Sequence, residues 1–256
     1  MLFLILASCS NLKKGTWGKK AIFPVKVEKI KNAFIKNITS AHVWAPVGIS
    51  AIVYGLDYDK KISNWISNER LAYSDQTESD NYSDNWNIIL KYEMYLSIFL
   101  PPSNSDKNIG HYFLNKAKGS VVVLGSEAIT RSTQHWLRDK TNRLRPNLKD
   151  RNSLPSGHAT QAGSRRVLTS KNLEASLLPQ KYHIGLNTFN TLISIGTLVA
   201  RVEGRRHYLT DVLTGYSLGS FLSGFIYDSF INYDPSTAVS LGPLPGGVMG
   251  QYAFNF

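Results

Sequence analysis

Large apolar side chains recur along most of the chain at helical spacing. One clear set lies between residues 85 and 99 and consists of Trp86, Ile89, Leu90, Met94 and Ile98. These positions fall near a 3.6-residue period, which is typical of one face of a helix. Pro101 and Pro102 follow directly and end the predicted helix, because proline cannot donate a backbone hydrogen bond.

Further stretches also predict helices: 119–138, 157–175, 181–203, 208–231 and the part of 37–56 after Pro46. Residues 57–84 are rich in Asp, Asn and Ser, which predicts a loop or short helices. Prolines and glycines in 233–256 predict a loop or a short hairpin, and strand-like alternation is confined to Tyr252–Phe256. The predicted fold class is therefore all-α, a helical bundle.

Three stretches lack Asp, Glu, Lys and Arg: 37–56, 182–200 and 212–227. Polar residues such as His42 and Asn187 interrupt the first two. None therefore approaches the run of about 18 continuous apolar residues that marks a membrane span. The mean hydropathy of −0.18 agrees. We expect these stretches to be helices buried in a water-soluble bundle.

The composition excludes intrinsic disorder and several kinds of site. Of 256 residues, 43% are hydrophobic and 11% are aromatic, which is enough to bury a core. The single cysteine, Cys9, excludes a disulfide framework, a cysteine zinc site and a CxxC redox centre. A formal net charge of +11 favours an anionic partner, whether nucleic acid, anionic lipid or a phosphate-bearing substrate.

The first nine residues, MLFLILASC, are almost wholly apolar. Leu6-Ala7-Ser8-Cys9 resembles the bacterial lipobox, in which a signal peptidase cuts before a cysteine that then carries lipid. A secretory signal normally has a basic start and a longer apolar run. Either the true start therefore lies upstream, or the apolar start is a buried N-terminus.

The lipoprotein alternative divides the chain into a truncated signal with a basic tether (1–36), a helical domain (37–232) and a C-terminal tail (233–256). Cys9 would be lipidated and would attach the protein to a membrane surface of the bacterial cell envelope. The helical domain would then lie in the periplasm, with the outer membrane as one candidate location. The tether would be weakly structured and contains Lys13, Lys14, Lys19, Lys20, Lys26, Lys29 and Lys31. Such lysines favour an anionic membrane by about 1 kcal/mol each, although a solvated linker would carry them as well.

Three segments hold most of the polar chemistry. In the last, His207 and Asp211 are four residues apart, so on a helix they share a face and the carboxylate can fix the imidazole tautomer. An oriented imidazole is what a nucleophile or a general base requires. Arg201, at the end of the preceding helix, could direct its guanidinium to the same place. The pair alone is weak evidence for function, because structural contacts between residues four apart on a helix are common.

The middle segment is Pro155-Ser156-Gly157-His158. Ser156 is a natural N-cap, and the backbone N–H groups of Gly157 and His158 open a helix, where an anion is stabilised. Glycine permits the close approach of an oxyanion, and His158 could give a proton to a leaving group. An ordinary capped helix start is the alternative.

The first segment, 138–146, supplies cations. Arg145 precedes Pro146 and is therefore extended or in a turn, and Arg138 lies one element earlier. Guanidinium groups match phosphate oxygens with two parallel hydrogen bonds. The other basic residues near this segment are expected to form a solvated loop: Lys140, Arg143, Lys149 and Arg151.

In this order and spacing, the three segments resemble the type 2 phosphatidic acid phosphatase superfamily, which includes bacterial class A acid phosphatases and vanadium haloperoxidases. The family pattern is Lys-x6-Arg-Pro, then Pro-Ser-Gly-His, then Ser-Arg-x5-His-x3-Asp. Here Arg145-Pro146, Pro155 to His158, and Arg201-x5-His207-x3-Asp211 match the pattern. The resemblance covers roughly 120–231 well and the N-terminal third only loosely.

The sequence departs from the family pattern in three places. Arg138 stands where the family has lysine, which keeps the charge but directs the hydrogen bonds differently. Ala200 replaces the serine before Arg201. The gap between Pro146 and Pro155 is shorter than the family usually shows, which leaves little room for a lid there.

The resemblance implies a metal-independent phosphatase that acts through a phosphohistidine intermediate and needs no cofactor. His207 would attack phosphorus, Asp211 would hold His207 oriented, and His158 would protonate the leaving oxygen. The phosphoryl oxygens would be bound by the residues that match the cationic and glycine-containing motifs: Arg138, Arg145, Ser156, Gly157 and Arg201.

The implied substrate is a phosphate monoester or a pyrophosphate, and a lipid anchor would favour a lipid. Three alternatives stay open: a nonspecific acid phosphatase, a haloperoxidase with vanadate as its cofactor, and a non-catalytic lipoprotein that binds phosphate. The basic residues are divided between a tether and an anion pocket, with no nucleic-acid motif, so we expect no nucleic-acid partner. The oligomeric state is left open.

Overall fold

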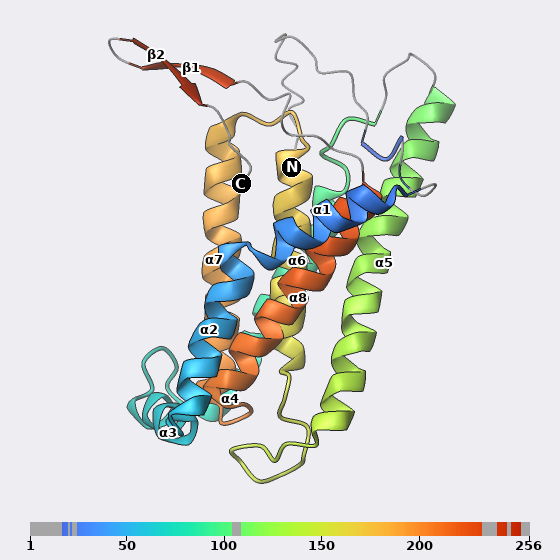
Figure 1. Cartoon of the computed structure of the whole chain (residues 1–256). Helices are drawn as coiled ribbons and strands as arrows, with labels where there is room; N and C mark the ends of the chain where they lie inside the picture. The colour runs from blue at the N-terminus through green and yellow to red at the C-terminus, as the bar shows by residue number, and fades with distance from the viewer. Residues whose placement is uncertain are drawn as a thin grey trace.

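The computed structural model describes residues 17–19, 21, 25–103 and 109–231, together with the backbone of 240–244 and 247–251. Within these residues the chain forms eight helices: α1 (Val27–Ile38), α2 (Ala41–Gly55), α3 (Asp59–Glu69), α4 (Gln76–Ser97), α5 (Ile109–Thr141), α6 (Gly157–Glu174), α7 (Gln180–Glu203) and α8 (Leu209–Phe230). Two short strands, β1 (Ser240–Leu244) and β2 (Gly247–Gln251), pair antiparallel in the tail. The predicted all-α helical class is confirmed (Figure 1).

Several helices extend beyond the predicted boundaries. α4 begins at Gln76, inside the stretch predicted to be a loop or short helices, because Asp75 caps it and accepts a hydrogen bond from the Glu78 N–H at 2.8 Å. α5 begins at Ile109, well before the predicted start at 119. Pro46 lies inside α2 instead of before it, where its ring removes one backbone hydrogen bond.

The segment predicted to be a weakly structured tether contains a helix that packs on the bundle. α1 lies against α8, and Asn37 at its end donates a hydrogen bond to Asp228 at 2.8 Å. Earlier in the chain, the buried Trp17 donates from its indole N–H to the hydroxyl of Tyr227 at 2.9 Å. The tether prediction was therefore wrong for residues 27–36, because Ala33 and Asn37, one turn apart, give α1 a face that fits α8.

α6 and α8 form the centre of the bundle. α6 packs against α4, α5, α7 and α8, while α8 packs against α1, α2, α5 and α6. The two central helices approach so closely that a Cβ atom at Gly219 would lie 2.0 Å from the carbonyl oxygen of Thr160. In the other direction, a Cβ atom at Gly163 would lie 2.3 Å from the carbonyl oxygen of Tyr216. Only glycine fits at either position.

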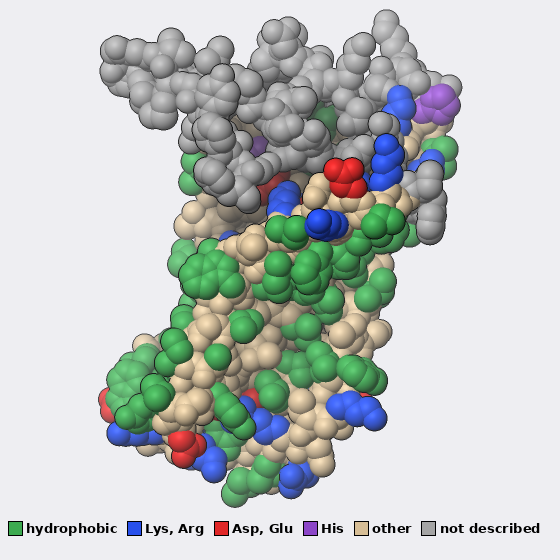
Figure 2. Space-filling model, in the orientation of Figure 1, with side chains coloured by type: hydrophobic (Ala, Val, Ile, Leu, Met, Phe, Trp, Pro, Cys, Tyr) green, Lys and Arg blue, Asp and Glu red, His purple; other side chains and the backbone are tan. Residues whose placement is uncertain are grey.

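The helix interfaces are rich in small polar side chains, whereas large apolar side chains cover much of the outside. The buried polar set includes Ser126, Thr130, Thr160, Ser164, Asn172, Ser194, Ser220 and Ser223. α7 alone exposes Tyr182, Ile184, Leu186, Phe189, Leu192 and Ile195. Figure 2 shows hydrophobic side chains across the middle of the visible face, with lysine and arginine mostly above and below them. The interior also holds an apolar cluster that includes Trp17, Met94 and Leu168, so the polarity of this bundle is only partly inverted.

This arrangement corrects one expectation. Residues 37–56 and 182–200 contribute to α1, α2 and α7, but their large apolar side chains are mostly exposed, so the prediction that these stretches are buried was wrong. Their inward positions hold small polar residues such as Ser50 and Ser194, which leaves the apolar face outside. Residues 212–227, within α8, are largely buried as expected. No helix in the described part of the chain has both the length and the hydropathy of a membrane span.

The close contact between α6 and α8 can be tested by adding a single methyl group. Gly219→Ala should lower the free energy of unfolding by about 2 kcal/mol, because the added methyl group must displace the backbone of α6. Thermal or urea denaturation followed by circular dichroism measures the change. Gly125→Ala on α5 is the matched control, since a Cβ atom there meets nothing within 4 Å and alanine favours a helix by about 1 kcal/mol. Equal effects of the two substitutions would contradict the close contact.

Candidate active site

The three polar segments lie together at one end of the bundle. The α5–α6 connection, the start of α6 and the α7–α8 turn all lie at the lower end in Figure 1. Ser156 donates its backbone N–H to the carbonyl oxygen of Asp211 at 3.1 Å, and the Gln134 amide donates to the carbonyl oxygen of Pro155 at 2.9 Å. These bonds hold the middle segment between α5 and α8.

His207 lies in the α7–α8 turn, before α8 begins at Leu209, and is 3% exposed. Its Nδ1 atom is 2.7 Å from the carbonyl oxygen of Ser153. A carbonyl oxygen only accepts hydrogen bonds, so Nδ1 carries the proton and Nε2 carries the lone pair. The His207 backbone is fixed as well, because its N–H donates to the carbonyl oxygen of Arg201 at 3.1 Å.

The surroundings of His207 keep its ring neutral. Burial lowers the pKa of the imidazole well below 6.5, and the positive charges of Arg201 and Arg145 lower this pKa further. The hydrogen bond to Ser153 opposes the shift without reversing it. A neutral ring leaves the Nε2 lone pair available for attack on an electron-poor atom.

Asp211 forms no described hydrogen bond to the His207 ring, and the prediction that the two residues share a helix face was wrong. His207 precedes the helix, whereas Asp211 lies in the first turn of α8 and accepts the backbone N–H of Tyr208 at 2.9 Å. The same carboxylate accepts a hydrogen bond from the hydroxyl of Ser153. Because the Ser153 carbonyl holds the imidazole, Asp211 is linked to His207 through Ser153.

Arg143 lies in a buried ion network, so the expectation of a solvated position was wrong for this residue. Its guanidinium bonds Asp211 at 2.7 Å and Asp59 at 2.6 Å, and it lies 4.4 Å from the centre of the Tyr208 ring. Burial opposes its charge, but the carboxylates of Asp211 and Asp59 raise the pKa of Arg143 above its ordinary value. The other three residues of that expected loop are exposed: Lys140, Lys149 and Arg151.

His158, the second residue of α6, pairs with a carboxylate that the sequence reasoning missed. Its Nε2 atom lies 2.7 Å from Asp84 on α4. Burial and the charge of Arg201 lower the pKa of His158, while Asp84 acts to raise it. A histidine between a cation and a carboxylate can both give and accept a proton. A signal for this partner existed, because Asp80 and Asp84 are four residues apart and share one face of a helix.

The two matched arginines each have an acidic partner. Arg201, 7% exposed, donates to Asp80 at 3.2 Å and to Ser83 at 3.0 Å. Burial lowers the pKa of Arg201 to about 10, so the group remains a cation at neutral pH. Arg145 donates to Asp150 at 2.8 Å within the α5–α6 connection. Both positive charges lower the pKa of the His207 imidazole.

Several donors of the predicted anion-binding residues have no described hydrogen-bond partner. Buried atoms of this kind include Ser156 Oγ, Arg201 Nε and Arg138 Nε. No described residue accepts the backbone N–H of Gly157. This group lies in the first turn of α6, where the N–H of Thr160 is the first to bond a carbonyl oxygen of the same segment. Buried donors without partners are costly, and an oxyanion at this helix start would satisfy them. These groups therefore fit a phosphate.

Arg138 stands slightly apart from the other predicted residues. It lies in the last turn of α5, where its described partners are His135 at 3.1 Å and Asp139 at 3.8 Å, both on the same helix. Gln134, one turn earlier, reaches the backbone of Pro155. The structure thus puts Arg138 beside the middle segment without a described bond to the other motif residues.

Two predicted features are not tested by the structure. Cys9, the predicted lipidation site, lies outside the described residues. The absence of a metal or cofactor also stays a prediction, although the described part of the chain contains no group of three or more His, Cys, Asp and Glu side chains placed to hold a metal ion.

Comparison with known proteins shows which family this part of the sequence is similar to. The family model described as the PAP2 superfamily, the type 2 phosphatidic acid phosphatases, matches residues 112–233. That part of the chain, which contains all three polar segments, is similar to the PAP2 superfamily, so the predicted resemblance is confirmed.

One similar solved structure is described as the first transmembrane PAP2-type phosphatidylglycerolphosphate phosphatase from Bacillus subtilis. It is 18% identical, the match covers 78% of this chain and 94% of that chain, and the TM-score is 0.48. Among curated proteins, none matches this sequence.

The buried network predicts a pH-dependent defect. Arg143→Met should lower the free energy of unfolding by about 3 kcal/mol, because two buried carboxylates lose their cation. Burial already raises the pKa of Asp211, and loss of Arg143 raises it further. A carboxyl group whose pKa in the folded protein exceeds the unfolded value of about 3.9 stabilises the folded state at low pH. This stabilisation is lost as pH rises. Urea denaturation should therefore show a smaller defect at about pH 5 than at about pH 8.

The exposed Arg151 supplies the control for this experiment. Arg151→Met removes the same charge without uncovering a buried carboxylate, so its effect should stay within about 0.5 kcal/mol at both pH values. A defect of Arg143→Met that is independent of pH would contradict the network.

The contact between Asp84 and His158 predicts how the pKa of His158 changes when the carboxylate is removed. Loss of burial would raise this pKa, whereas loss of Asp84 should lower it. Asp84→Asn should lower the pKa of His158 further, because the carboxylate that raises it is removed while burial and Arg201 remain. NMR titration of the imidazole measures this pKa. Asp57→Asn, at an exposed turn, should leave it unchanged. An unchanged or higher pKa in Asp84→Asn would show that the carboxylate does not act on this ring.

Proposed function

We propose that this protein is a phosphatase that hydrolyses phosphate monoesters or pyrophosphates of lipids. The observation that carries the proposal is the state of His207. Its Nδ1 proton is held by a backbone carbonyl, its ring is neutral, and its Nε2 lone pair is free while two guanidinium charges lie nearby. A neutral nucleophile beside fixed cations suits attack on the phosphorus of an anionic phosphate.

In the first step, Nε2 of His207 forms a bond to phosphorus as the bond from phosphorus to the leaving oxygen breaks. Protonated His158 gives its proton to that oxygen, and Asp84 stabilises the charged form of His158 before the transfer. The products of this step are the free alcohol, or the shorter phosphate, and a phosphohistidine.

In the second step, water attacks phosphorus and the bond to Nε2 breaks. Neutral His158 accepts the proton of the attacking water, inorganic phosphate leaves, and both histidines return to their starting states. No metal ion and no cofactor takes part in either step of this proposal.

The anion-binding groups support the same chemistry. Arg145 and Arg201 supply positive charge, while Ser156 Oγ and the N–H of Gly157 supply hydrogen bonds at the start of α6. These groups are held in place before the substrate arrives, so they stabilise the charge that develops on the phosphoryl oxygens at little reorganisation cost. Arg138, at the edge of the group, would add a further cation through its Nε, which has no described hydrogen-bond partner.

The apolar outside of the bundle supports a lipid substrate. Contiguous exposed apolar surface marks a site of contact with another molecule or with a membrane. Here such side chains run along α2, α4, α5 and α7, and the candidate site lies at one end of these helices. A lipid whose apolar part lies along this surface would bring its head group to that end. Lipidation of Cys9 would add a second attachment to the same membrane.

The nucleophile can be tested by its removal. His207→Ala should lower phosphate release at least about 1000-fold, because no other described group holds a free imidazole lone pair in the anion site. His183→Ala, on the opposite part of α7, should retain the wild-type rate. The assay compares a phosphatidic acid in mixed micelles with a soluble aryl phosphate. Full activity of His207→Ala would overturn the phosphatase proposal, whereas equal kcat/KM values for the two substrates would overturn only the lipid preference.

A further inference from the structure

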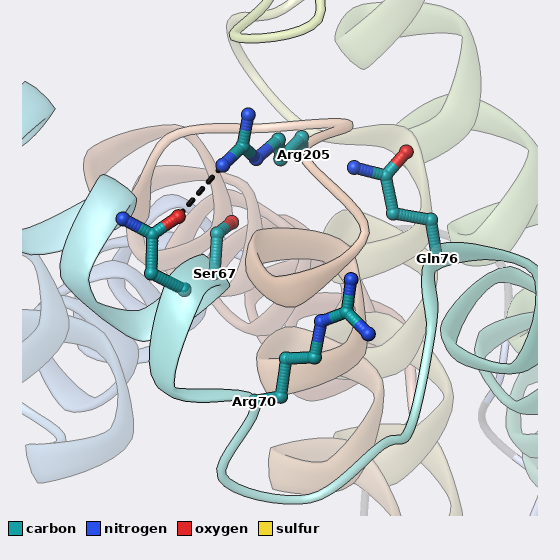
Figure 3. Close-up of a pocket in the computed structure, with 5 residues that line it drawn as sticks. Ser67, Arg70, Gln76 and Arg205 are labelled. Atoms are coloured by element: carbon teal, nitrogen blue, oxygen red, sulfur yellow. Dashed lines mark hydrogen bonds between the residues drawn. The ribbon is translucent and has the colours of Figure 1, made fainter.

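A polar hollow lies beside the α7–α8 turn, and none of its lining residues belongs to the predicted catalytic or phosphate-binding set. It has a volume of about 470 Å³ and is lined by Ser67, Asn68, Arg70, Gln76 and Arg205 (Figure 3). These residues come from the end of α3, the start of α4 and the turn after α7. In Figure 3, Arg70 extends from the end of α3 toward the side on which Arg205 lies. None of the five lining residues is acidic.

The two arginines of this hollow differ from those of the catalytic end. Arg205 donates to the side-chain oxygen of Asn68 at 2.7 Å, and Arg70 donates to the carbonyl oxygen of Ser74. Among the described residues, neither forms an ion pair with a carboxylate. By contrast, a carboxylate forms an ion pair with each of four other arginines: Arg143, Arg145, Arg201 and Arg206. A guanidinium has five N–H donors, so both arginines keep positive charge and donors for a ligand.

Both arginines also hold a backbone conformation that arginine seldom adopts. The φ angle is 50° at Arg70, which caps α3, and 52° at Arg205. This left-handed region favours glycine or asparagine, because a Cβ atom crowds the following carbonyl group. The sequence nevertheless has a long cation at each position.

The walls of the hollow are fixed to the catalytic end of the bundle. The hydroxyl of Ser67 donates to the carbonyl oxygen of Val202 at 2.8 Å. The carboxylate of Glu203 accepts the backbone N–H groups of Ala72 and Tyr73, each at 3.0 Å. The segment that carries Arg70 is thus attached to the end of α7, close to Arg205. The backbone that carries the two arginines is therefore held by a rigid frame, as a binding site requires.

We propose that this hollow is a second anion site, which binds a phosphate group other than the one that reaches His207. Arg70 and Arg205 supply two positive charges in fork geometry, and the amides of Asn68 and Gln76 supply further hydrogen bonds. The ligand is a phosphate oxyanion, carried either by a soluble phosphate or by the head group of an anionic lipid. The site does not depend on the proposed hydrolysis.

The test uses the full chain and inorganic phosphate in isothermal titration calorimetry. Wild type should show two binding events. Arg70→Gly combined with Arg205→Gly should weaken one of them at least about tenfold, while the melting temperature stays equal or rises because glycine suits both backbone positions. Asp57→Gly is the matched control, since Asp57 has a φ angle of 56° at an exposed turn outside the hollow. It should raise stability and leave both binding events unchanged.

Two further measurements separate the outcomes. Arg70→Gln keeps a long polar side chain without the charge, so it should weaken the same event even if the double variant fails to fold. His207→Ala should abolish hydrolysis and keep this event, which separates the second site from the proposed activity. Identical phosphate binding by wild type, Arg70→Gln and the double variant would overturn the proposal.

The source of the phosphate is distinguished with vesicles. Flotation compares vesicles of phosphatidylcholine with vesicles that also contain phosphatidylglycerol. Weaker binding of the double variant to the anionic vesicles alone would assign the site to a lipid head group. A difference seen only with inorganic phosphate would assign it to a soluble ligand.

Discussion

The catalytic end of this bundle depends on one buried carboxylate. Asp211 is fully buried and receives hydrogen bonds from Arg143, from the Ser153 hydroxyl and from the Tyr208 backbone. Arg143 in turn bonds Asp59 on α3. A buried charge is stable only while its partners stay in place. α3, the α5–α6 connection and α8 therefore cannot separate at this end without leaving a charge uncompensated, and this constraint sets the position of the Ser153 carbonyl that holds His207.

Around this fixed centre, acidic residues of α4 balance the cations of the site. Asp80 pairs with Arg201, and Asp84 pairs with His158. The two carboxylates stabilise positive charge on residues that would otherwise repel one another in a buried space. His207 has no such carboxylate and stays neutral. Burial and Arg201 lower the pKa of both imidazoles, but only His158 has a carboxylate partner that acts to raise it. This difference suits a nucleophile and a proton donor.

The sequence predicted the parts of this arrangement that are local along the chain. Helical periodicity predicted the class, and motif spacing singled out His207, His158 and Arg201, which the fold brings to one end. The partners that lie far away in the chain were missed: Asp84 is 74 positions from His158, and Asp59 is 84 from Arg143. Periodicity also shows that a helix has an apolar face without showing whether that face points inward. On α7 the face that packs consists mostly of small and polar residues, and most of the large apolar side chains are exposed.

The bond from His207 to the Ser153 carbonyl has a consequence for how this site can change over evolution. The acceptor is a main-chain atom, so no substitution of a side chain can delete it. Replacement of Ser153 or Asp211 can shift the carbonyl but leaves its chemical character intact. The path of the backbone therefore fixes which nitrogen of His207 carries the proton. The neighbouring side chains can vary and change the reactivity of the imidazole in small steps.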